Sequence, residues 1–295
     1  MNRLVGLGSI VVDLVLAVPA VPEPGGDVLA TSSTTAVGGG LNVLVAATRA
    51  GLACAYGGGH GTGPFGDLVR AALAAHDVTV LLAPSSQEDT GFCVVLVDRT
   101  GERTFATTVG AEGRLTADQL RTLDVRPDDH VYVSGYDLAY PHADVVADAV
   151  SALPQGCTVL LDPGPLVADV DPAVLDRVLR RTGWLSVNAR EAALWTGRPD
   201  PGEAAAVLLR THQVLAGAVV RDGADGCLVA TRATGPLRVP GVRAARVVDT
   251  NGAGDVHAGT FLAGLAVGLE PVAAAASANA AAAVAVASPG PGLGQ

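Results

Sequence analysis

The sequence predicts an α/β protein built as a three-layer α/β/α sandwich, with a mostly parallel central sheet and a small β-sheet lid. From about residue 116 onward, short apolar runs of strand composition alternate with helical segments, a pattern typical of parallel pairing through right-handed crossovers. Two earlier segments, residues 11–37 and 90–108, are β-rich and break this alternation. A length of 295 residues suits one domain. We therefore expect residues 1–295 to form a single domain whose lid comes from these two segments.

The N-terminal segments predict the first core strand and both halves of the lid. Residues 4–10 are apolar and read as a core strand. The runs 9–18 and 28–37 are β-rich, and the prolines and glycines between them predict a turn. Residues 90–97 and 103–108 flank a Gly-containing loop and predict a β-hairpin. The lid should lie over the carboxyl ends of the main strands, where open α/β sheets bind ligands.

Two helices are predicted between the halves of the lid. Glycines 38–40 open a helical run over 43–50, and Gly51 ends it because glycine readily adopts the left-handed conformation found at helix C-termini. Pro64 suits the first position of a helix that continues over 65–76, since that position needs no N–H donor.

The remaining elements follow the alternating pattern. Thr116 and Gln119 have the spacing of a capping box at the start of a helix. Residues 242–248 predict a strand or an extended approach to the last two helices. Further strands are predicted at 53–57, 78–82, 130–133, 157–161, 184–187, 214–220 and 226–230, and further helices at 143–153, 172–181, 189–195, 203–211, 254–267 and 271–287.

The composition excludes several classes of function. The net charge is −10, so we expect no nucleic-acid partner and no anionic membrane surface as a partner. All 19 basic residues are Arg, and the chain has no lysine. Schiff-base chemistry, a phosphate loop ending in Gly-Lys-Ser/Thr and a protein-kinase lysine are therefore excluded. Phosphate charge must be met by Arg, by backbone N–H groups or by a metal.

The cysteines and the N-terminal segment favour a cytoplasmic protein. The four cysteines are far apart, form no CxxC motif and predict free thiols in a reducing compartment. The six histidines show no pair at metal-ligand spacing. The N-terminus lacks the pattern of a signal peptide. The apolar stretch 271–287 is mostly Ala, so it predicts a buried helix rather than a membrane span.

An anion site is predicted where the run Asp-Thr-Asn-Gly-Ala-Gly-Asp, residues 249–255, leads into an apolar helix. The backbone N–H groups of Gly252, Ala253 and Gly254 lie at the helix N-terminus, where unsatisfied donors and the helix dipole favour negative charge. A carboxylate is a poor guest for such a site. We therefore interpret Asp255 as a base that lies beside a bound phosphate and accepts a proton from an attacking hydroxyl. Alternatively, Asp255 caps the helix and the glycines make a tight turn.

A second group of polar residues predicts ligand binding near the N-terminus. Gly38, Gly39 and Gly40 allow a ligand to approach the backbone closely, and the Asn42 amide can both donate and accept hydrogen bonds. Asp13 lies within an apolar strand, where a carboxylate is costly without a partner. The alternatives are a simple turn with an N-capping Asn and a strand-end Asp that faces water.

These motifs resemble those of the ribokinase-like (PfkB-type) carbohydrate kinases. Residues 249–255 resemble the C-terminal signature of the family, residues 38–42 its N-terminal glycine motif and residues 8–13 its opening strand, and the resemblance extends from residue 8 to about 290. It implies an ATP-dependent kinase that uses Mg²⁺ and allows a monovalent cation such as K⁺. Asp255 would be the general base, and Gly252, Ala253 and Gly254 would stabilise the transferred group.

The resemblance also implies which residues hold the acceptor. They are Asp13, Gly38, Gly39, Asn42 and Tyr136. Gly39 occupies the position where members that act on phosphorylated sugars often have Lys, so we expect a small unphosphorylated sugar or a nucleoside. Val11 replaces an Asn that is common in ribokinases, so the sequence does not specify ribose.

On the nucleotide side, the resemblance implies ATP contacts from six residues: Asn188, Glu191, Arg221, Gly223, Gly226 and Asn279. Glu191 would reach Mg²⁺ through water, since Mg²⁺ needs few carboxylates. Asp249 and Thr250 would support the monovalent cation. Each motif also has a structural alternative, namely a helix N-cap at Asn188, a hairpin loop at Arg221 and a buried amide bonded to backbone at Asn279.

The sequence departs from the family pattern at two further positions. Gly63 replaces the acid of a Gly-x-Asp turn, and His257 replaces a usual Phe, for which we expect a packing role.

Three other interpretations fit parts of the sequence. A non-catalytic sugar or nucleotide sensor and a kinase for a sugar phosphate are both compatible with the motifs. A dinucleotide-dependent oxidoreductase is disfavoured, because Gly6 and Gly8 are not followed by a third glycine and the run continues as a strand. The lid could also pair with a second chain, which would give a homodimer.

Overall fold

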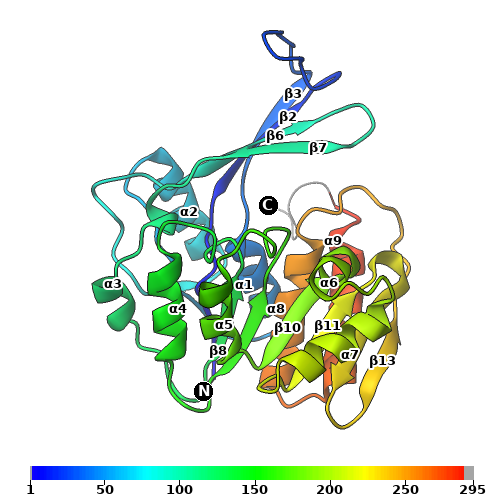
Figure 1. Cartoon of the computed structure of the whole chain (residues 1–295). Coiled ribbons are helices and arrows are strands. Elements are labelled where there is room, and N and C mark those ends of the chain that lie inside the picture. The colour runs from blue at the N-terminus through cyan, green and yellow to red at the C-terminus, as the bar shows by residue number, and fades with distance from the viewer. Residues whose placement is uncertain (1, 289–295) are drawn as a thin grey trace.

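The central element of the structure, a computed structural model that describes residues 2–288, is a nine-stranded sheet (Figure 1). Its order is β13-β12-β11-β10-β9-β8-β1-β4-β5. All neighbours pair in parallel except β11 with β12 and β12 with β13, which are antiparallel. The strands are β1 (Leu4–Gly6), β4 (Cys54–Tyr56), β5 (Thr79–Val80), β8 (His130–Ser134), β9 (Thr158–Asp162), β10 (Trp184–Asn188), β11 (Gly217–Arg221), β12 (Gly226–Thr231) and β13 (Gly235–Pro240).

Helices cover both faces of this sheet, which confirms the three predicted layers. Neighbouring residues of a strand point to opposite faces, and accordingly Leu160 packs in one hydrophobic cluster and Leu161 in another. The Leu160 side contains α1 (Gly40–Arg49), α2 (Pro64–Ala75), α8 (Ala253–Ala266) and α9 (Pro271–Ala285). The Leu161 side contains α3 (Ala117–Arg121), α4 (Ala143–Ser151), α5 (Pro172–Leu179), α6 (Ala189–Thr196) and α7 (Pro201–Thr211).

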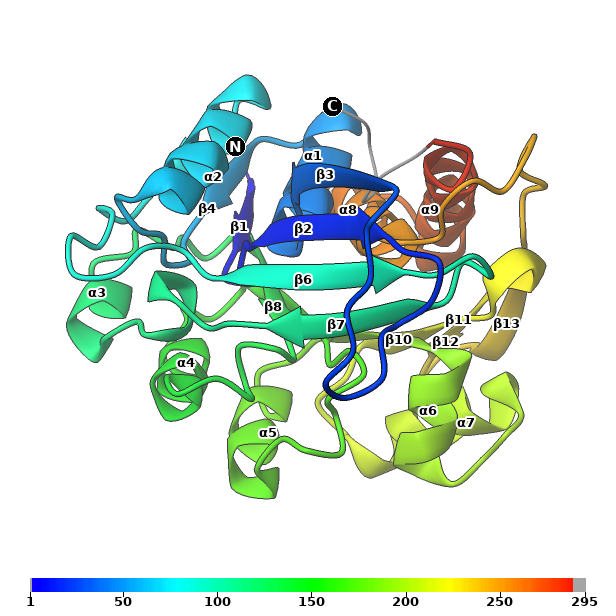
Figure 2. The ribbon, with the colours of Figure 1, turned by 90° about the horizontal axis from the view of Figure 1, so that it is seen from above.

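A second sheet of four strands lies above the carboxyl ends of the central strands (Figure 2). Its order is β3-β2-β6-β7, with β2 and β6 parallel and the two outer pairs antiparallel. We call this sheet the lid, and its strands are β2 (Val12–Ala17), β3 (Ser32–Val37), β6 (Phe92–Val97) and β7 (Arg103–Thr107). All four strands lie inside the two segments that the sequence marked as β-rich. Of the predicted domain, residues 1 and 289–295 lie outside the described part of the chain.

Most predicted helix boundaries agree with the structure to within a few residues. Gly51 has φ +89° and follows α1, as its predicted C-terminal role requires. The capping box of Thr116 and Gln119 is present, with both reciprocal hydrogen bonds formed. One strand was not predicted: β13 contains Pro236 and Pro240, which lower strand propensity and are tolerated because β13 is at the sheet edge. Residues 242–248 form the extended approach rather than a strand.

Helix α2 receives its N-terminal cap from a residue distant in the sequence. Gly63 occupies the N-cap position and has no side chain to offer. The Asp89 carboxylate instead accepts hydrogen bonds from the N–H groups of Phe65 (3.0 Å) and Gly66 (2.8 Å). A Cβ at position 63 would lie 2.5 Å from Asp89 Oδ2. Glycine at this turn therefore makes room for the carboxylate that caps the helix.

Replacement of Asp89 by Ala should lower the free energy of unfolding by about 1–2 kcal/mol, the usual cost of losing a helix cap. Denaturant or thermal unfolding measures the change. Asp67→Ala is the matched control, because Asp67 lies in the first turn of the same helix but is exposed and pairs with Arg70 at the surface. Equal losses in the two variants would contradict the capping role.

Among residues 2–288, no helix combines the length and apolar character needed to cross a bilayer.

Candidate active site

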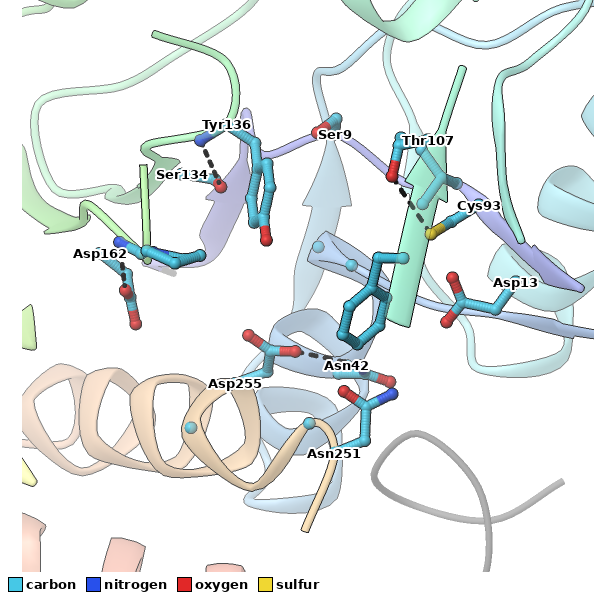
Figure 3. A pocket seen from close by; sticks show the side chains of 18 of the residues that line it. Ser9, Asp13, Asn42, Cys93, Thr107, Ser134, Tyr136, Asp162, Asn251 and Asp255 are labelled. Atoms are coloured by element: carbon cyan, nitrogen blue, oxygen red, sulfur yellow. Dashed lines mark hydrogen bonds between the residues drawn. The ribbon is translucent and has the colours of Figure 1, made fainter. Parts of the chain in front are cut away.

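A cavity of about 390 Å³ lies between the lid and the carboxyl ends of the central strands (Figure 3). It brings together residues from segments that are far apart in the sequence. Ten of the predicted site residues line it: Asp13, Gly39, Asn42, Tyr136, Asn188, Glu191, Arg221, Gly252, Gly254 and Asp255. Two other predicted site residues, Gly38 and Ala253, are not part of the lining.

Asp255 lies in the first turn of α8, beside the helix N-terminus. Gly252 caps the helix with φ +72°, a left-handed conformation that favours glycine. The Ala253 N–H donates to the Thr250 carbonyl oxygen at 3.4 Å, whereas Gly252 and Gly254 line the cavity. The first N–H groups of a helix have no carbonyl partner within the helix. The turn therefore presents backbone donors at the edge of the cavity, next to a carboxylate.

The Asp255 carboxylate faces the cavity and accepts a hydrogen bond of 3.1 Å from the Asn42 amide (Figure 3). Burial raises the pKa of Asp255 to about 7, and the nearby Asp162 and Asp13 carboxylates act in the same direction. The Asn42 hydrogen bond and the Arg221 guanidinium oppose this increase. A carboxyl group with a pKa near neutrality can take up a proton at physiological pH, which is the property that a general base needs.

Arg221 lies at the floor of the cavity, at the end of β11. Its Nη1 donates to Asp162 Oδ2 at 2.6 Å and to Ser186 Oγ at 2.8 Å, and it lies 3.4 Å from the Gly254 carbonyl oxygen. Its Nη2 is 3.7 Å from Glu191 Oε2. The guanidinium thus joins three neighbouring strand ends to the first turn of α8.

Asp162 is the acidic residue of the site that the sequence interpretation missed. It is the last residue of β9, is buried and also accepts a hydrogen bond of 3.1 Å from the Gly164 N–H. The available signal was a carboxylate that ends a wholly apolar run and precedes Pro163 and Gly164. Because β9, β10 and β11 are adjacent in the sheet, Asp162 comes within reach of Arg221.

The acceptor end of the cavity is formed by Asp13 from the lid and Asn42 from α1. Burial raises the pKa of Asp13 to about 6, and the Arg103 guanidinium partly opposes this. A Cβ at Gly38 would lie 2.7 Å from Asp13 Oδ2, so glycine leaves room for the carboxylate. Gly39 has φ +64° and its Cα approaches the backbone of Ser9 closely. Protein atoms thus occupy the space that a side chain at Gly38 or Gly39 would fill, so both glycines are required by the packing of the chain. The predicted approach of a ligand to this backbone stays a prediction.

Asn188 and Glu191 form a reciprocal capping box at the start of α6. The Asn188 side chain accepts from the Glu191 N–H, and the Glu191 carboxylate accepts from the Asn188 N–H, both at 2.8 Å. Both residues also line the cavity. The cap and a nucleotide-side role are compatible, because each carboxylate or amide oxygen has a second lone pair.

Five predicted nucleotide and cation residues lie outside the cavity lining: Gly223, Gly226, Asn279, Asp249 and Thr250. Asn279 is buried in α9, and its amide donates to the carbonyl oxygens of Val239 (3.2 Å) and Pro240 (3.1 Å). Gly223 has φ +57° with no atom near its Cβ position, so that side of the turn is open, whereas a Cβ at Gly226 would lie 2.3 Å from the Val239 carbonyl oxygen. Thr250 lies in the segment that leads into the turn before α8.

Asp249 links the turn before α8 to the lid. Its Oδ1 accepts from the Asn251 N–H at 2.9 Å and from Arg103 Nη2 at 2.5 Å. Arg103 is the first residue of the lid strand β7. An ion pair therefore connects the lid directly to the segment that leads into Gly252.

His257 packs inside the protein, two residues after Asp255. Its imidazole is buried and stacks on Phe261 with ring centroids 6.5 Å apart. Burial lowers the pKa of His257 to about 3, so the ring is neutral. It does not line the cavity.

Magnesium can be tested against the donors that the structure provides. Residues 2–288 contain no group of three or more His, Cys, Asp or Glu side chains placed to hold a metal ion. Glu191 nevertheless lines the cavity with Asp162 close by. One or two carboxylates suit an ion that keeps most of its waters and binds substrate phosphates.

The fold and the cavity together define a class of protein, the ribokinase-like kinases. A solved ribokinase structure, from Cryptococcus neoformans var. grubii serotype A in complex with ADP, aligns with a TM-score of 0.82 and 25% identity, over 98% of this chain and 95% of that one. Among curated relatives, the "Uncharacterized sugar kinase YegV" of Escherichia coli (strain K12) is 32% identical over 91% of this chain and 83% of its own length. Mus musculus ribokinase is 29% identical, over 87% and 79% respectively.

The family model for pfkB family carbohydrate kinases matches residues 1–295. The chain therefore belongs to the pfkB family of carbohydrate kinases, which are phosphotransferases with an alcohol group as acceptor.

Proposed function

We propose that this chain is an ATP-dependent kinase that phosphorylates a hydroxyl of a small unphosphorylated sugar or nucleoside, with Asp255 as general base. The observation that carries the proposal is the position of Asp255. Its carboxylate faces the cavity beside the N-terminus of α8, bonds to Asn42 and has a pKa raised to about 7. A base and a set of backbone donors thus meet at one point.

In the proposed reaction, the acceptor is held by Asp13, Gly38, Gly39, Asn42 and Tyr136. Asp255 takes the hydroxyl proton as that oxygen attacks the γ-phosphorus of ATP in line. The bond from the γ-phosphorus to the bridging oxygen of the β-phosphate breaks, and ADP leaves. The N–H groups of Gly252, Ala253 and Gly254 stabilise the charge on the transferred group. Phosphoryl transfer depends on positioning and charge stabilisation more than on covalent catalysis, and these residues supply both.

On the nucleotide side, we assign ATP contacts to Asn188, Glu191, Arg221, Gly223, Gly226 and Asn279. Bound Mg²⁺ would neutralise phosphate charge, and Glu191 would hold it through water. Asp249 and Thr250 would support a monovalent cation beside the same turn. A comparison of turnover in K⁺ and in a bulky organic cation tests this last assignment.

A phosphorylated acceptor fits the cavity less well than a neutral one. The two arginines nearest the acceptor and the base already have carboxylate partners, Arg103 with Asp249 and Arg221 with Asp162. The lining also contributes the carboxylates of Asp13 and Asp255. An added phosphate would therefore meet negative charge without a free cation among the lining residues, and like charges in a partly desolvated site are costly.

The proposed base predicts a specific pH dependence. The ionised form of Asp255 is the active one, so kcat/KM should rise with pH and reach half of its plateau near pH 7, falling about tenfold per pH unit below that. Initial rates between pH 5 and 9 at subsaturating acceptor measure this limb. A flat profile down to pH 5 would contradict the raised pKa.

The proposed function is tested by measuring ADP release with ATP and Mg²⁺ across free pentoses, hexoses, nucleosides and sugar phosphates. Turnover that depends on a free sugar or a nucleoside supports the kinase. ATP binding with no acceptor-dependent turnover would favour a sensor instead.

We also infer that the lid pairs with the lid of a second copy. Asp13 and Cys93 face the cavity, so the alternate residues Leu16 and Val94 point to the other face of the lid, where they are only partly buried. Multi-angle light scattering on the chain and on Leu16→Glu tests this: a monomeric wild type would overturn it.

A further inference from the structure

Several aromatic side chains line the cavity. Aromatic residues make up only 3% of the chain. Even so, Phe105, Tyr132, Tyr136 and Tyr140 all line this one cavity. Their enrichment indicates a ligand with a flat or apolar part in addition to hydroxyl groups.

Phe105 presents an uncovered ring on the cavity face of the lid. It lies on β7 two residues before Thr107, and residues two apart on a strand share a face. Thr107 and its cross-strand partner Cys93 both line the cavity. Phe105 itself is 56% exposed. A large apolar side chain exposed on the inner face of a lid is a surface that a ligand would cover.

Tyr136 forms part of the opposite wall. It follows β8, and its N–H donates to Ser134 Oγ at 3.2 Å, which fixes the backbone at the edge of the central sheet. Its ring points into the cavity, across from the lid residues Asp13 and Thr107, as Figure 3 shows. As a whole residue, Tyr136 is 41% exposed. The cavity therefore has one exposed aromatic ring on the lid and one on the body.

Polar groups in the same cavity are suited to neutral hydroxyls. Asp13 and Asn42 line the same cavity, with Asn42 beside Asp255 and Asp13 on the side away from Tyr136 (Figure 3). Carboxylate and amide groups bond hydroxyls well. As argued above, Arg103 and Arg221 are paired with carboxylates. The ligand that matches all of these groups is uncharged, has several hydroxyls and includes an aromatic ring.

We propose that the acceptor is a nucleoside rather than a free sugar, an inference that rests on the proposed kinase function. Its ribose hydroxyls bond to Asp13 and Asn42, and its base packs beneath the lid against Phe105, facing Tyr136. Aromatic rings favour stacked or edge-to-face contacts, so the base gains an interaction that a free sugar does not have. Phe105 is then a specificity-determining residue.

The test compares kcat/KM for adenosine, inosine, uridine and cytidine with kcat/KM for D-ribose, in the wild type and in Phe105→Ala. We expect at least one nucleoside to exceed ribose about tenfold or more. Phe105→Ala should raise the KM for that nucleoside about tenfold, with the KM for ATP unchanged, and Phe105→Tyr should restore most of the loss. Thr104→Ala is the matched control, because Thr104 is the neighbouring exposed residue on the other face of β7.

The outcomes separate this inference from the proposed function. Efficient turnover of free sugars with no preference for nucleosides would overturn the nucleoside inference and leave the kinase intact. If no acceptor is turned over, binding of the same nucleosides is measured by calorimetric titration. Binding that is weaker in Phe105→Ala would support the aromatic site and contradict the kinase function. Absence of binding would overturn both the nucleoside inference and the proposed function. If Phe105→Ala does not fold, Phe105→Leu provides the same comparison, because Leu keeps apolar bulk without the ring.

Discussion

Replacement of Asp255 by Asn should lower kcat at least about 100-fold while leaving ATP binding intact. General bases contribute about this factor to proton transfer. An amide at position 255 keeps the size of the side chain and can still bond to Asn42, but it cannot accept the hydroxyl proton. The nucleotide contacts proposed for α6 and for the β11–β12 turn do not involve this side chain. The loss should therefore appear in kcat and not in the dissociation constant for ATP.

Single-turnover kinetics and calorimetric titration of ATP measure the two quantities separately. The unfolding temperature of Asp255→Asn is the control that shows whether the variant is correctly folded. The pKa of Asp255 in the folded protein, about 7, is above its ordinary value of 3.8. The folded state therefore binds this proton more tightly than the unfolded state. The contribution of the protonated Asp255 to the free energy of unfolding is fully present below about pH 4 and is lost as the pH rises through 7. At pH 8, Asp255→Asn should therefore unfold at the same or a higher temperature than the wild type. Full activity in a well-folded variant would sink the assignment of the base.

The motif residues of the site could be predicted because each motif is local. Gly252 to Asp255 are consecutive, and a strand-to-helix turn is enough to place backbone donors beside a carboxylate. The same holds for Asn188 and Glu191, whose spacing makes a capping box at the start of a helix. Local sequence determines such arrangements, so the sequence shows them directly.

The residues that were not predicted reach the cavity through pairings between distant strands. Asp162 meets Arg221 only because β9, β10 and β11 are neighbours in the central sheet. Phe105 and Cys93 enter through the register of β6 with β7 and of β6 with β2. A shift of one residue in that register would turn both side chains away from the cavity. Sheet order and register follow from the packing of the whole chain, so no short motif encodes them.

Arg221 has other partners in the structure than the phosphate that its sequence motif suggested. The sequence suggested an arginine that reaches an ATP phosphate. In the structure, its side chain is only 13% exposed and is held by Asp162, Ser186 and the Gly254 carbonyl, with Glu191 close by. Its charge therefore offsets two carboxylates of the site and lowers the pKa of Asp255, whether or not it also contacts a phosphate.

Replacement of Arg221 by Met should lower the free energy of unfolding by about 3–5 kcal/mol, because Asp162 and Glu191 are then buried without a cation. Denaturant unfolding measures this loss. Arg177→Met is the matched control: Arg177 also pairs with two carboxylates, Asp144 and Asp148, but these are exposed, so the loss should be much smaller than for Arg221→Met.

The pH profile of kcat/KM distinguishes an electrostatic role of Arg221 from a purely structural one. Since Arg221 lowers the pKa of Asp255 and Asp162 raises it, the two charges act on the base in opposite directions. Arg221→Met should move the acidic limb to higher pH, whereas Asp162→Asn should move it to lower pH. A structural role alone would reduce the folded fraction in both variants and leave both midpoints near that of the wild type. Midpoints that shift in opposite directions would show that this buried pair tunes the base, and unchanged midpoints with lowered stability would restrict the pair to holding the strand ends together.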